Sequence, residues 1–331
     1  MENFFQYEEL GRGSSSIVYK GRERGTLNYI AIICADKSKR PEITNHVRLC
    51  HNLDHPNIVR FYEWYMTSKH LWMIVELCSG GSLESLILDD KGLSEVTVRE
   101  FGLDVVRGLE HIHKSGIIFS DLTPAKILLD GSGRLKFSNF SRAKAVGDTE
   151  DFYVSLSKCD WGTNGDCKET FDAFKKRFQG SPVYTAPEVF QGAETSVASD
   201  LWALGCVLYY MYTGKPPFYS EHYAEIRKMI LQQEPPAPKQ TVFPDSRPSK
   251  EFLKLLRGLL QKNPKKRLTW PEIINHPFWT CKRTEENLAD CKEKMEKSSQ
   301  RLTKTAEVPQ SRGQADQASN SSVVHSADSQ C

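Results

Sequence analysis

Two neighbouring stretches are the most informative about the fold of this chain: GIIFSDLTPAKILLD at residues 116–130 and RLKFSNFSRAK at residues 134–144. The second stretch follows turn residues and is typical of a strand that leads into a loop. The loop carries the triplet Asn139-Phe140-Ser141, and the first stretch carries Asp121. What these polar side chains can do depends on the fold that brings the two loops together.

The patterns around these stretches predict two parts of different secondary structure. Strand-like runs lie at 16–23, 28–34, 57–66 and 71–78, and a helix with proline in its first turn is expected over 41–53. Helical periodicity follows over 82–89, 94–115, 196–213, 220–232, 249–261 and 271–275. Strands first and helices afterwards predict an α+β chain with two lobes, joined near residues 77–81.

Seven motifs occur in the order of the eukaryotic protein kinase family. They are GRGSSSIVYKG, HPNIV, MIVELCSGGSL, GIIFSDLTPAKILLD, GSPVYTAPE, SDLWALGCVLYYMYTGKPPF and NPKKRLTWPEIINHPFW. One motif alone would be weak, but seven in order make a strong resemblance to that family. Within it, the opening MENF, the segment CADKSKRPEITN and the segment KFSNF resemble the unc-51-like group, and in that group a pseudokinase.

The resemblance implies a two-lobed protein kinase fold, with a β-rich N-lobe and a helical C-lobe. The expected domain covers residues 4–279, with the N-lobe at about 4–77, the hinge at about 76–81 and the C-lobe at about 82–279. Residues 280–331 form a polar tail with little to bury, so we expect disorder there. An insert of mixed charge and poor patterning lies at 146–178.

The groups that the family uses for phosphoryl transfer are largely replaced. Ile33 stands where the resemblance places the phosphate-binding lysine, and His46 stands where that lysine has its glutamate partner. Thr123 replaces the lysine that would face the γ-phosphate, and Ser120 replaces the arginine before the aspartate. Asp121 keeps the position of the catalytic base, but removing one well-placed electrostatic group already costs on the order of 10²–10³ in rate. The sequence therefore favours a pseudokinase.

The positions that would hold magnesium are replaced as well. Asn139 stands for a ligating aspartate and keeps an oxygen without the charge. Lys126 stands for a ligating asparagine, and a lysine has donors only. Because hard cations prefer anionic oxygen ligands, we expect no metal site.

The residues that the resemblance assigns to the nucleotide are better retained. Apolar side chains would cover both faces and the back of the adenine, hinge backbone groups would pair its edge, and two glycines would let the loop approach the phosphates. The residues expected at these places are Gly11, Gly13, Val18, Ala31, Val75, Glu76, Cys78 and Leu128. The third glycine of the loop is Ser16.

Lys126 leads to a specific hypothesis about the cofactor. In this fold its ammonium would lie beside the phosphates, where it can neutralise charge and repel a divalent cation. We therefore expect ATP binding that does not require magnesium, with Asn139 nearby and with Lys39 or Lys37 as a second cation. The alternatives are that Lys39 and Lys37 are solvated loop lysines, and that Lys126 is a surface lysine.

Composition limits the partners and the location. The net charge of +2, from 44 basic and 42 acidic residues, predicts neither a nucleic-acid nor a membrane partner. The longest apolar run, at 201–212, is too short to span a bilayer. Nine cysteines without a CxxC pair are typical of reduced thiols, which favours a cytoplasmic location.

The favoured interpretation is a regulatory scaffold that ATP stabilises and that protein partners recognise. The resemblance implies roles around microtubules, cilia and neurite growth, with an active kinase among the partners. Two alternatives stay open. One is a weakly active or atypical serine/threonine kinase that uses Asp121, and the other is an interaction module without a nucleotide.

Overall fold

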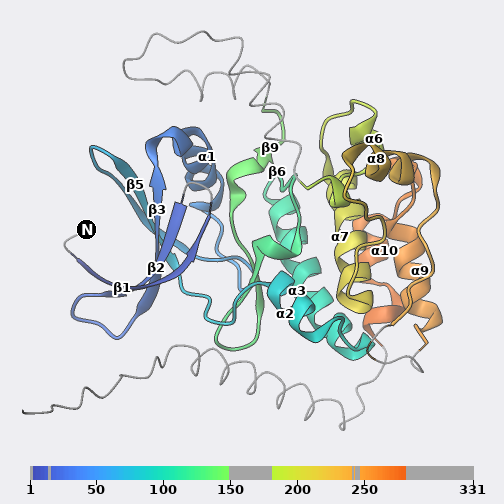
Figure 1. Ribbon diagram of the computed structural model, residues 1–331, viewed down its shortest axis with the longest axis horizontal. Coiled ribbons are helices and arrows are strands. Elements are labelled where there is room, and N and C mark those ends of the chain that lie inside the picture. The colour runs from blue at the N-terminus through green and yellow to red at the C-terminus, as the bar shows by residue number, and fades with distance from the viewer. Residues whose placement is uncertain (1–2, 14–15, 149–180, 241, 243–246, 281–331) are drawn as a thin grey trace, which may run out of the picture.

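A computed structural model describes residues 3–13, 16–148, 181–240, 242 and 247–280. The prediction of disorder for the tail at 280–331 falls outside this part, apart from its first residue. Most of the insert at 146–178 also lies outside it. Figure 1 shows the described chain as a β-rich part beside a helical part, and the predicted two-lobed α+β architecture is confirmed.

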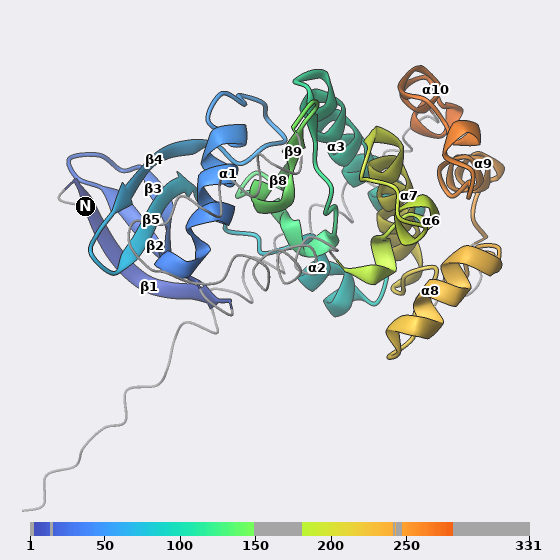
Figure 2. The ribbon, with the colours of Figure 1, turned by 90° about the horizontal axis from the view of Figure 1, so that it is seen from above.

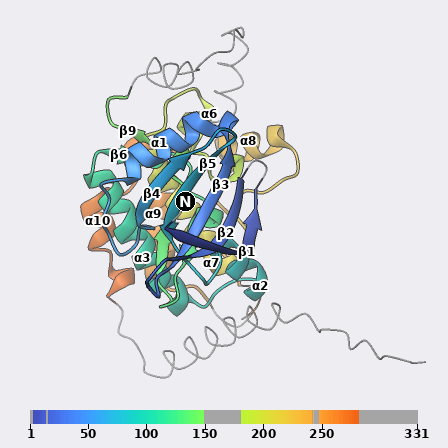
Figure 3. The same cartoon turned by 90° about the vertical axis from the view of Figure 1, so that its left-hand side faces the viewer.

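The β-rich lobe is a five-stranded antiparallel sheet with the order β1-β2-β3-β5-β4, seen face-on in Figure 3. The strands are β1 (Phe4–Arg12), β2 (Ser16–Glu23), β3 (Tyr29–Asp36), β4 (Phe61–Met66) and β5 (His70–Glu76). Successive residues of β3 point to opposite faces, so Ile32 packs with Ile74 on one face while Ala31 packs with Val75 on the other. This second face turns toward the helical lobe.

The strand predicted over 57–66 starts only at Phe61, which corrects the prediction. Arg60 still accepts a backbone hydrogen bond from Glu76 of β5, but Asn57 and Val59 bond to the helical lobe instead of the sheet. Phe137 donates its N–H to the carbonyl of Asn57 at 2.8 Å, and its own carbonyl accepts from Val59 at 2.9 Å. These bonds tie the two lobes together directly beside the loop of Asn139.

Helix α1 (Arg40–Cys50) lies on the sheet, with Pro41 in its first turn as predicted. Ile43 buries its side chain against Leu71 and Met73 of β5. The helix ends at Cys50, three residues earlier than predicted, because the chain turns there and Leu53 donates its N–H to the Cys50 carbonyl. Figure 2 shows α1 between the sheet and the segment that carries β8 and β9.

The helical lobe confirms the six predicted helices within a few residues at each end. It comprises α2 (Leu83–Asp90), α3 (Glu95–Lys114), α6 (Pro187–Phe190), α7 (Val197–Thr213), α8 (Tyr223–Gln232), α9 (Lys250–Leu259) and α10 (Trp270–Ile274). The four-residue helix α6 was not predicted, because one turn is too short to show a period. Helix α7 is buried on all sides from Ser199 to Thr213, which fits its mainly apolar sequence; Asp200 in its first turn is an exception. Within the described ranges, no helix has the length and apolar character that a bilayer crossing needs.

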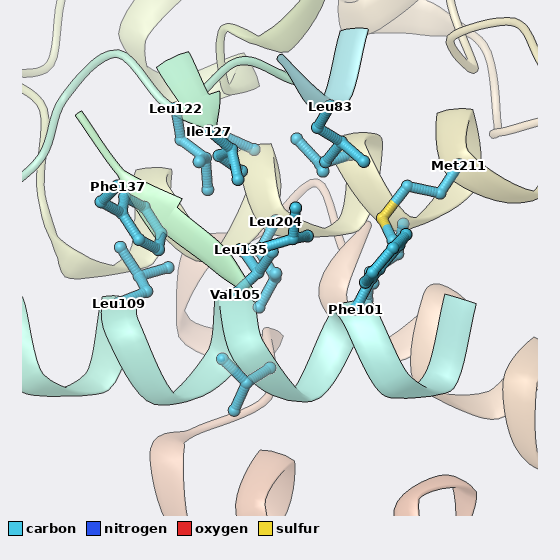
Figure 4. Close-up of a cluster of buried hydrophobic side chains, with 14 of the residues drawn as sticks. Leu83, Phe101, Val105, Leu109, Leu122, Ile127, Leu135, Phe137, Leu204 and Met211 are labelled. Atoms are coloured by element: carbon cyan, nitrogen blue, oxygen red, sulfur yellow. The ribbon is translucent and has the colours of Figure 1, made fainter. Parts of the chain in front are cut away.

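Two small sheets fix the loops that carry the candidate site. Strands β6 (Ile117–Ile118) and β9 (Lys144–Ala145) form one, and β7 (Ile127–Leu129) and β8 (Leu135–Phe137) form the other. Both rest on α3, whose apolar residues recur every three or four positions. Figure 4 shows Leu109 of α3 beside Phe137 of β8 in this shared core.

Candidate functional site

The loop between β6 and β7 presents Asp121, and it is held from behind by Asp200 in the first turn of α7. The Asp200 carboxylate accepts hydrogen bonds from the backbone N–H of Phe119 at 2.7 Å and of Ser120 at 2.9 Å. His113 Nε2 lies 2.8 Å from the same carboxylate. Asp200 thus caps this loop, and the anchor keeps Ser120 at a φ of 64°, a conformation that non-glycine residues rarely adopt.

Two cations meet on one oxygen of Asp121. The Lys126 ammonium forms an ion pair with Oδ2, and Arg142 Nη1 lies 3.3 Å from that atom. The Asp121 side chain is 6% exposed, Lys126 is 14% exposed and Arg142 is 32% exposed. A carboxylate that is covered and paired with two cations in this way is poorly placed to take a proton from a substrate hydroxyl.

Sequence reasoning missed Arg142. It lies three residues after Asn139, in the loop that the resemblance already placed opposite Asp121. This position in the loop was the signal from which a contact between Arg142 and Asp121 could have been predicted. Arg142 closes the short 3-10 turn η3 (Phe140–Arg142), which fixes the stretch of backbone from which its side chain reaches across.

Lys126 is enclosed, which does not fit the alternative of a surface lysine. Its Nζ lies 5.9 Å from the ring centroid of Phe119. Burial lowers the pKa of Lys126, while the neighbouring charge of Asp121 acts in the opposite direction. Ser138, directly before Asn139, donates its backbone N–H to the Lys126 carbonyl at 2.9 Å, so the loop of Asp121 and the loop of Asn139 lie side by side.

Asn139 uses its amide oxygen locally. Its Oδ1 accepts a hydrogen bond from the Ser141 N–H at 3.2 Å, and its backbone has a φ of 56°. The following residue, Phe140, is buried and packs edge-to-face on Phe119 with ring centroids 5.2 Å apart. Phe140, Phe119 and Cys50 share one core cluster.

Magnesium does not fit the side chains assembled here. Asp121 is covered by two cations, Lys126 offers only donors, and the oxygen of Asn139 already accepts a hydrogen bond. Among the described residues, no group of three or more His, Cys, Asp or Glu side chains is placed to hold a metal ion.

Helix α1 contacts the Asn139 loop through two residues that sequence reasoning did not assign to this contact. His46 Nδ1 accepts a hydrogen bond from the Phe140 N–H at 2.7 Å. Asn45 Nδ2 donates to the carbonyls of Ser141 at 3.1 Å and Ala143 at 2.8 Å. Burial lowers the pKa of His46 to about 4, helped by the charge of Lys126, so the imidazole is neutral at pH 7.

The residues predicted to surround adenine come together from both lobes. Ala31 of β3 and Val75 of β5 are buried in one cluster, and Val18 of β2 and Leu128 of β7 pack against it. Cys78, just after β5, belongs to the same cluster. Burial raises the pKa of the Cys78 thiol to about 12, so this side chain stays protonated and apolar in behaviour.

The glycines of the β1–β2 hairpin lie at the end of β1 and in the turn that follows. Gly11 is the penultimate residue of β1 and lies beside open space, and Gly13 donates its N–H to the Ser16 carbonyl at 2.8 Å. The side chain of Glu76 forms an ion pair with the buried Lys136 of β8 at 2.8 Å. This second link between the lobes was not predicted.

Lys39 lies in the turn before α1 and forms an ion pair with Glu42 at 3.2 Å, while Lys37 is exposed. The Lys39 ammonium is therefore paired with a residue at the start of α1, whereas the Lys126 ammonium is paired with Asp121. Elsewhere, Glu188 and Arg267 form a bidentate contact at 2.8 and 3.0 Å.

Comparison with known proteins gives a consistent picture. The family model described as the protein kinase domain matches residues 4–279. Serine/threonine-protein kinase ULK4 of Mus musculus is 54% identical over 282 residues, which cover 84% of this chain and 22% of that protein. Serine/threonine-protein kinase RUNKEL of Arabidopsis thaliana is 38% identical over 284 residues, covering 85% and 19%. Serine/threonine-protein kinase 36 of Mus musculus is 29% identical over 283 residues, covering 84% and 19%. The chain thus spans about a fifth of the length of the relatives it matches.

Proposed function

Because the chain belongs to the protein kinase family, as predicted, we propose that it is a pseudokinase that binds ATP without magnesium and acts as a regulatory scaffold. The observation that carries the proposal is the arrangement at Asp121, whose Oδ2 is shared by Lys126 and Arg142. Where an active site would need a free base and a metal, this chain has a covered carboxylate and an ammonium.

The lack of phosphoryl transfer follows from what each position offers. Transfer depends on positioning and on neutralising phosphate charge with lysine and magnesium. Ile33 packs its apolar side chain under α1, and His46 is buried and neutral. An intact kinase turns over at about 1–100 s⁻¹, so losing several of these groups together leaves no useful rate.

Nucleotide binding is supported by the apolar cluster between the lobes. Val18 and Ala31 come from the sheet and Leu128 comes from the helical lobe, so an adenine ring inserted among them would have apolar contacts above and below. Backbone groups at Glu76 and Cys78 would pair its edge, and this pairing does not depend on side-chain identity. Gly11 and Gly13 would lie along the phosphates.

Lys126 would neutralise the phosphates in place of a metal ion. Its ammonium is a compact charge on a flexible stem, which suits a point contact with a phosphate oxygen. A bound divalent cation next to this ammonium would be repelled. Lys39 is a candidate for a second contact, provided that its side chain leaves Glu42.

A scaffold role follows from ligand linkage. A nucleotide that contacts both lobes stabilises the closed arrangement by RT ln(1 + [L]/Kd), which is about 2.7 kcal/mol at a hundredfold excess over Kd. Protein partners would then recognise one conformation. Association with an active kinase and with microtubules, cilia or neurites is proposed from the resemblance alone.

The test is a titration of the protein with ATP in EDTA and, separately, in excess magnesium. We expect similar affinity in both media, and a loss of about tenfold or more for Lys126→Ala, corresponding to one charged contact. Lys254→Ala on the exposed side of α9 is the matched control. Affinity that appears only with magnesium would refute the proposal.

The active-kinase alternative is tested by phosphotransfer. Transfer of the γ-phosphate that disappears in Asp121→Ala would support that alternative instead. If ATP shows no saturable binding in either medium, the remaining interpretation is an interaction module that binds no nucleotide.

A further inference from the structure

We propose that Arg142 is a positioning residue for the nucleotide, which keeps the Asp121 carboxylate paired when the Lys126 ammonium turns to a phosphate. The inference rests on the proposed binding of ATP and assigns a role to a residue that neither the motif pattern nor the family comparison singles out. It starts from the finding that both cations contact the same atom, Asp121 Oδ2.

The local charges leave one cation in excess. Asp121 supplies one negative charge, while Lys126 and Arg142 supply two positive charges. His46 adds none, because burial lowers its pKa to about 4. One of the two cations is therefore available to an anion, and the remaining cation can still balance the carboxylate.

The cost of releasing Lys126 depends on Arg142. A buried carboxylate left without a partner is penalised by several kcal/mol. Asp121 is almost fully buried, so it would hold Lys126 tightly if Lys126 were its sole cation. With Arg142 at 3.3 Å from the same oxygen, the carboxylate stays paired after the ammonium leaves.

The geometry shows which cation moves. Arg142 ends the turn η3, whose backbone is held by α1 through the Phe140 N–H on His46 and the Ser141 carbonyl on Asn45. Its planar guanidinium is pre-organised for a carboxylate. Lys126 has a single ammonium on a flexible stem, so it can swing to a new acceptor without moving the backbone. Arg142 is thus the fixed partner and Lys126 the mobile one.

The experiment measures ATP affinity in EDTA for a double-variant set. We expect Arg142→Gln to weaken binding by about tenfold, because Lys126 is then retained by Asp121. Asp121→Asn alone is expected to strengthen binding a few-fold, since a neutral amide releases the ammonium. The double variant Asp121→Asn/Arg142→Gln should return to within about threefold of the unmodified protein.

The rescue separates positioning from direct contact. If the double variant stays as weak as Arg142→Gln, Arg142 touches the phosphates itself and the proposal is wrong. It is also wrong if Asp121→Asn lowers the affinity, a result that does not depend on whether Arg142→Gln folds. Arg142→Lys, which keeps the charge, should bind close to the unmodified protein.

Controls distinguish this inference from the proposed function. Arg257→Gln on the exposed side of α9 removes the same charge far from the nucleotide and should leave the affinity unchanged. If the unmodified protein fails to bind ATP in EDTA, the proposed function is wrong. If it binds and Arg142→Gln binds equally well, only the role of Arg142 is wrong.

Discussion

The imidazole of His46 accepts a hydrogen bond from the backbone N–H of Phe140 at 2.7 Å, with the two rings 6.0 Å apart. This contact joins α1 of the sheet lobe to the loop that faces Asp121. The family places a charged glutamate at this position, whereas here a neutral ring takes over the structural link. The assembled arrangement of the lobes is therefore kept without the ion pair that transfer requires.

Acid should destabilise the protein through His46. Its folded-state pKa of about 4 lies below the ordinary 6.5, so between these values the unfolded chain binds a proton that the folded chain does not. The free energy of unfolding therefore falls as the pH drops through this window, by about 2 kcal/mol at pH 5 from this residue alone. Urea unfolding at pH 7.5 and pH 5 measures the loss.

His46→Gln keeps an acceptor for the Phe140 N–H and does not titrate. Between pH 7.5 and pH 5, its free energy of unfolding should therefore fall by about 2 kcal/mol less than that of the unmodified protein. His222→Gln, at an exposed histidine before α8, is the control and should behave like the unmodified protein. An equal pH dependence for His46→Gln and the unmodified protein would contradict the assignment.

Restoring the lost ligand types should create a requirement for magnesium. In Lys126→Asn/Asn139→Asp, the ammonium is removed and an anionic oxygen returns, which suits a hard cation. ATP affinity in EDTA should fall by about tenfold or more, and magnesium should recover it. Calorimetric titration in both media checks this, and identical affinity in the two media would speak against the role of Lys126.

A bulky residue in the apolar cluster should block the nucleotide. Val18→Phe fills the space between β2 and Leu128 where the adenine would lie. Because Val18 is only half-buried, the fold should tolerate the change while ATP affinity falls by about tenfold or more. Val146→Phe, at an exposed position, is the matched control. Unchanged affinity in Val18→Phe would place the adenine elsewhere.

Asp200→Ala should destabilise the whole helical lobe. It leaves the N–H groups of Phe119 and Ser120 without their buried acceptor, and removing one member of such a network costs about 3–5 kcal/mol. Chemical denaturation measures the change. Asp89→Ala, at an exposed position on α2, should shift stability by no more than about 0.5 kcal/mol. A similar small shift for Asp200→Ala would show that the anchor is dispensable.

Much of the fold could be read from local pattern. The strands of the sheet and the main helices follow from periods of two and of three to four residues, because each element must bury one face. The prediction of the strand over 57–66 was wrong at its start, where residues form hydrogen bonds with a segment far away in the sequence. Residues 57–60 have a strand-like composition, yet Asn57 and Val59 bond to Phe137 of the other lobe, and no local pattern records such a partner.

For the candidate site, the chemical groups that are present could be named from the sequence. Ile33, His46, Thr123, Lys126 and Asn139 stand at the positions that the family resemblance assigns to phosphoryl transfer, and their side-chain chemistry predicts that magnesium is disfavoured. The residues expected to face adenine could be named for the same reason, since the expectation follows from position in a motif.

How those groups pair depends on the packing of elements that lie far apart in the chain. Asn45 and His46 contact residues more than ninety positions away, and Lys126 and Arg142 reach Asp121 from different loops. Such pairs depend on where packed elements place each backbone, and on whether a charge ends up buried. A sequence states the charge of a side chain, but only the folded arrangement sets which opposite charge balances it.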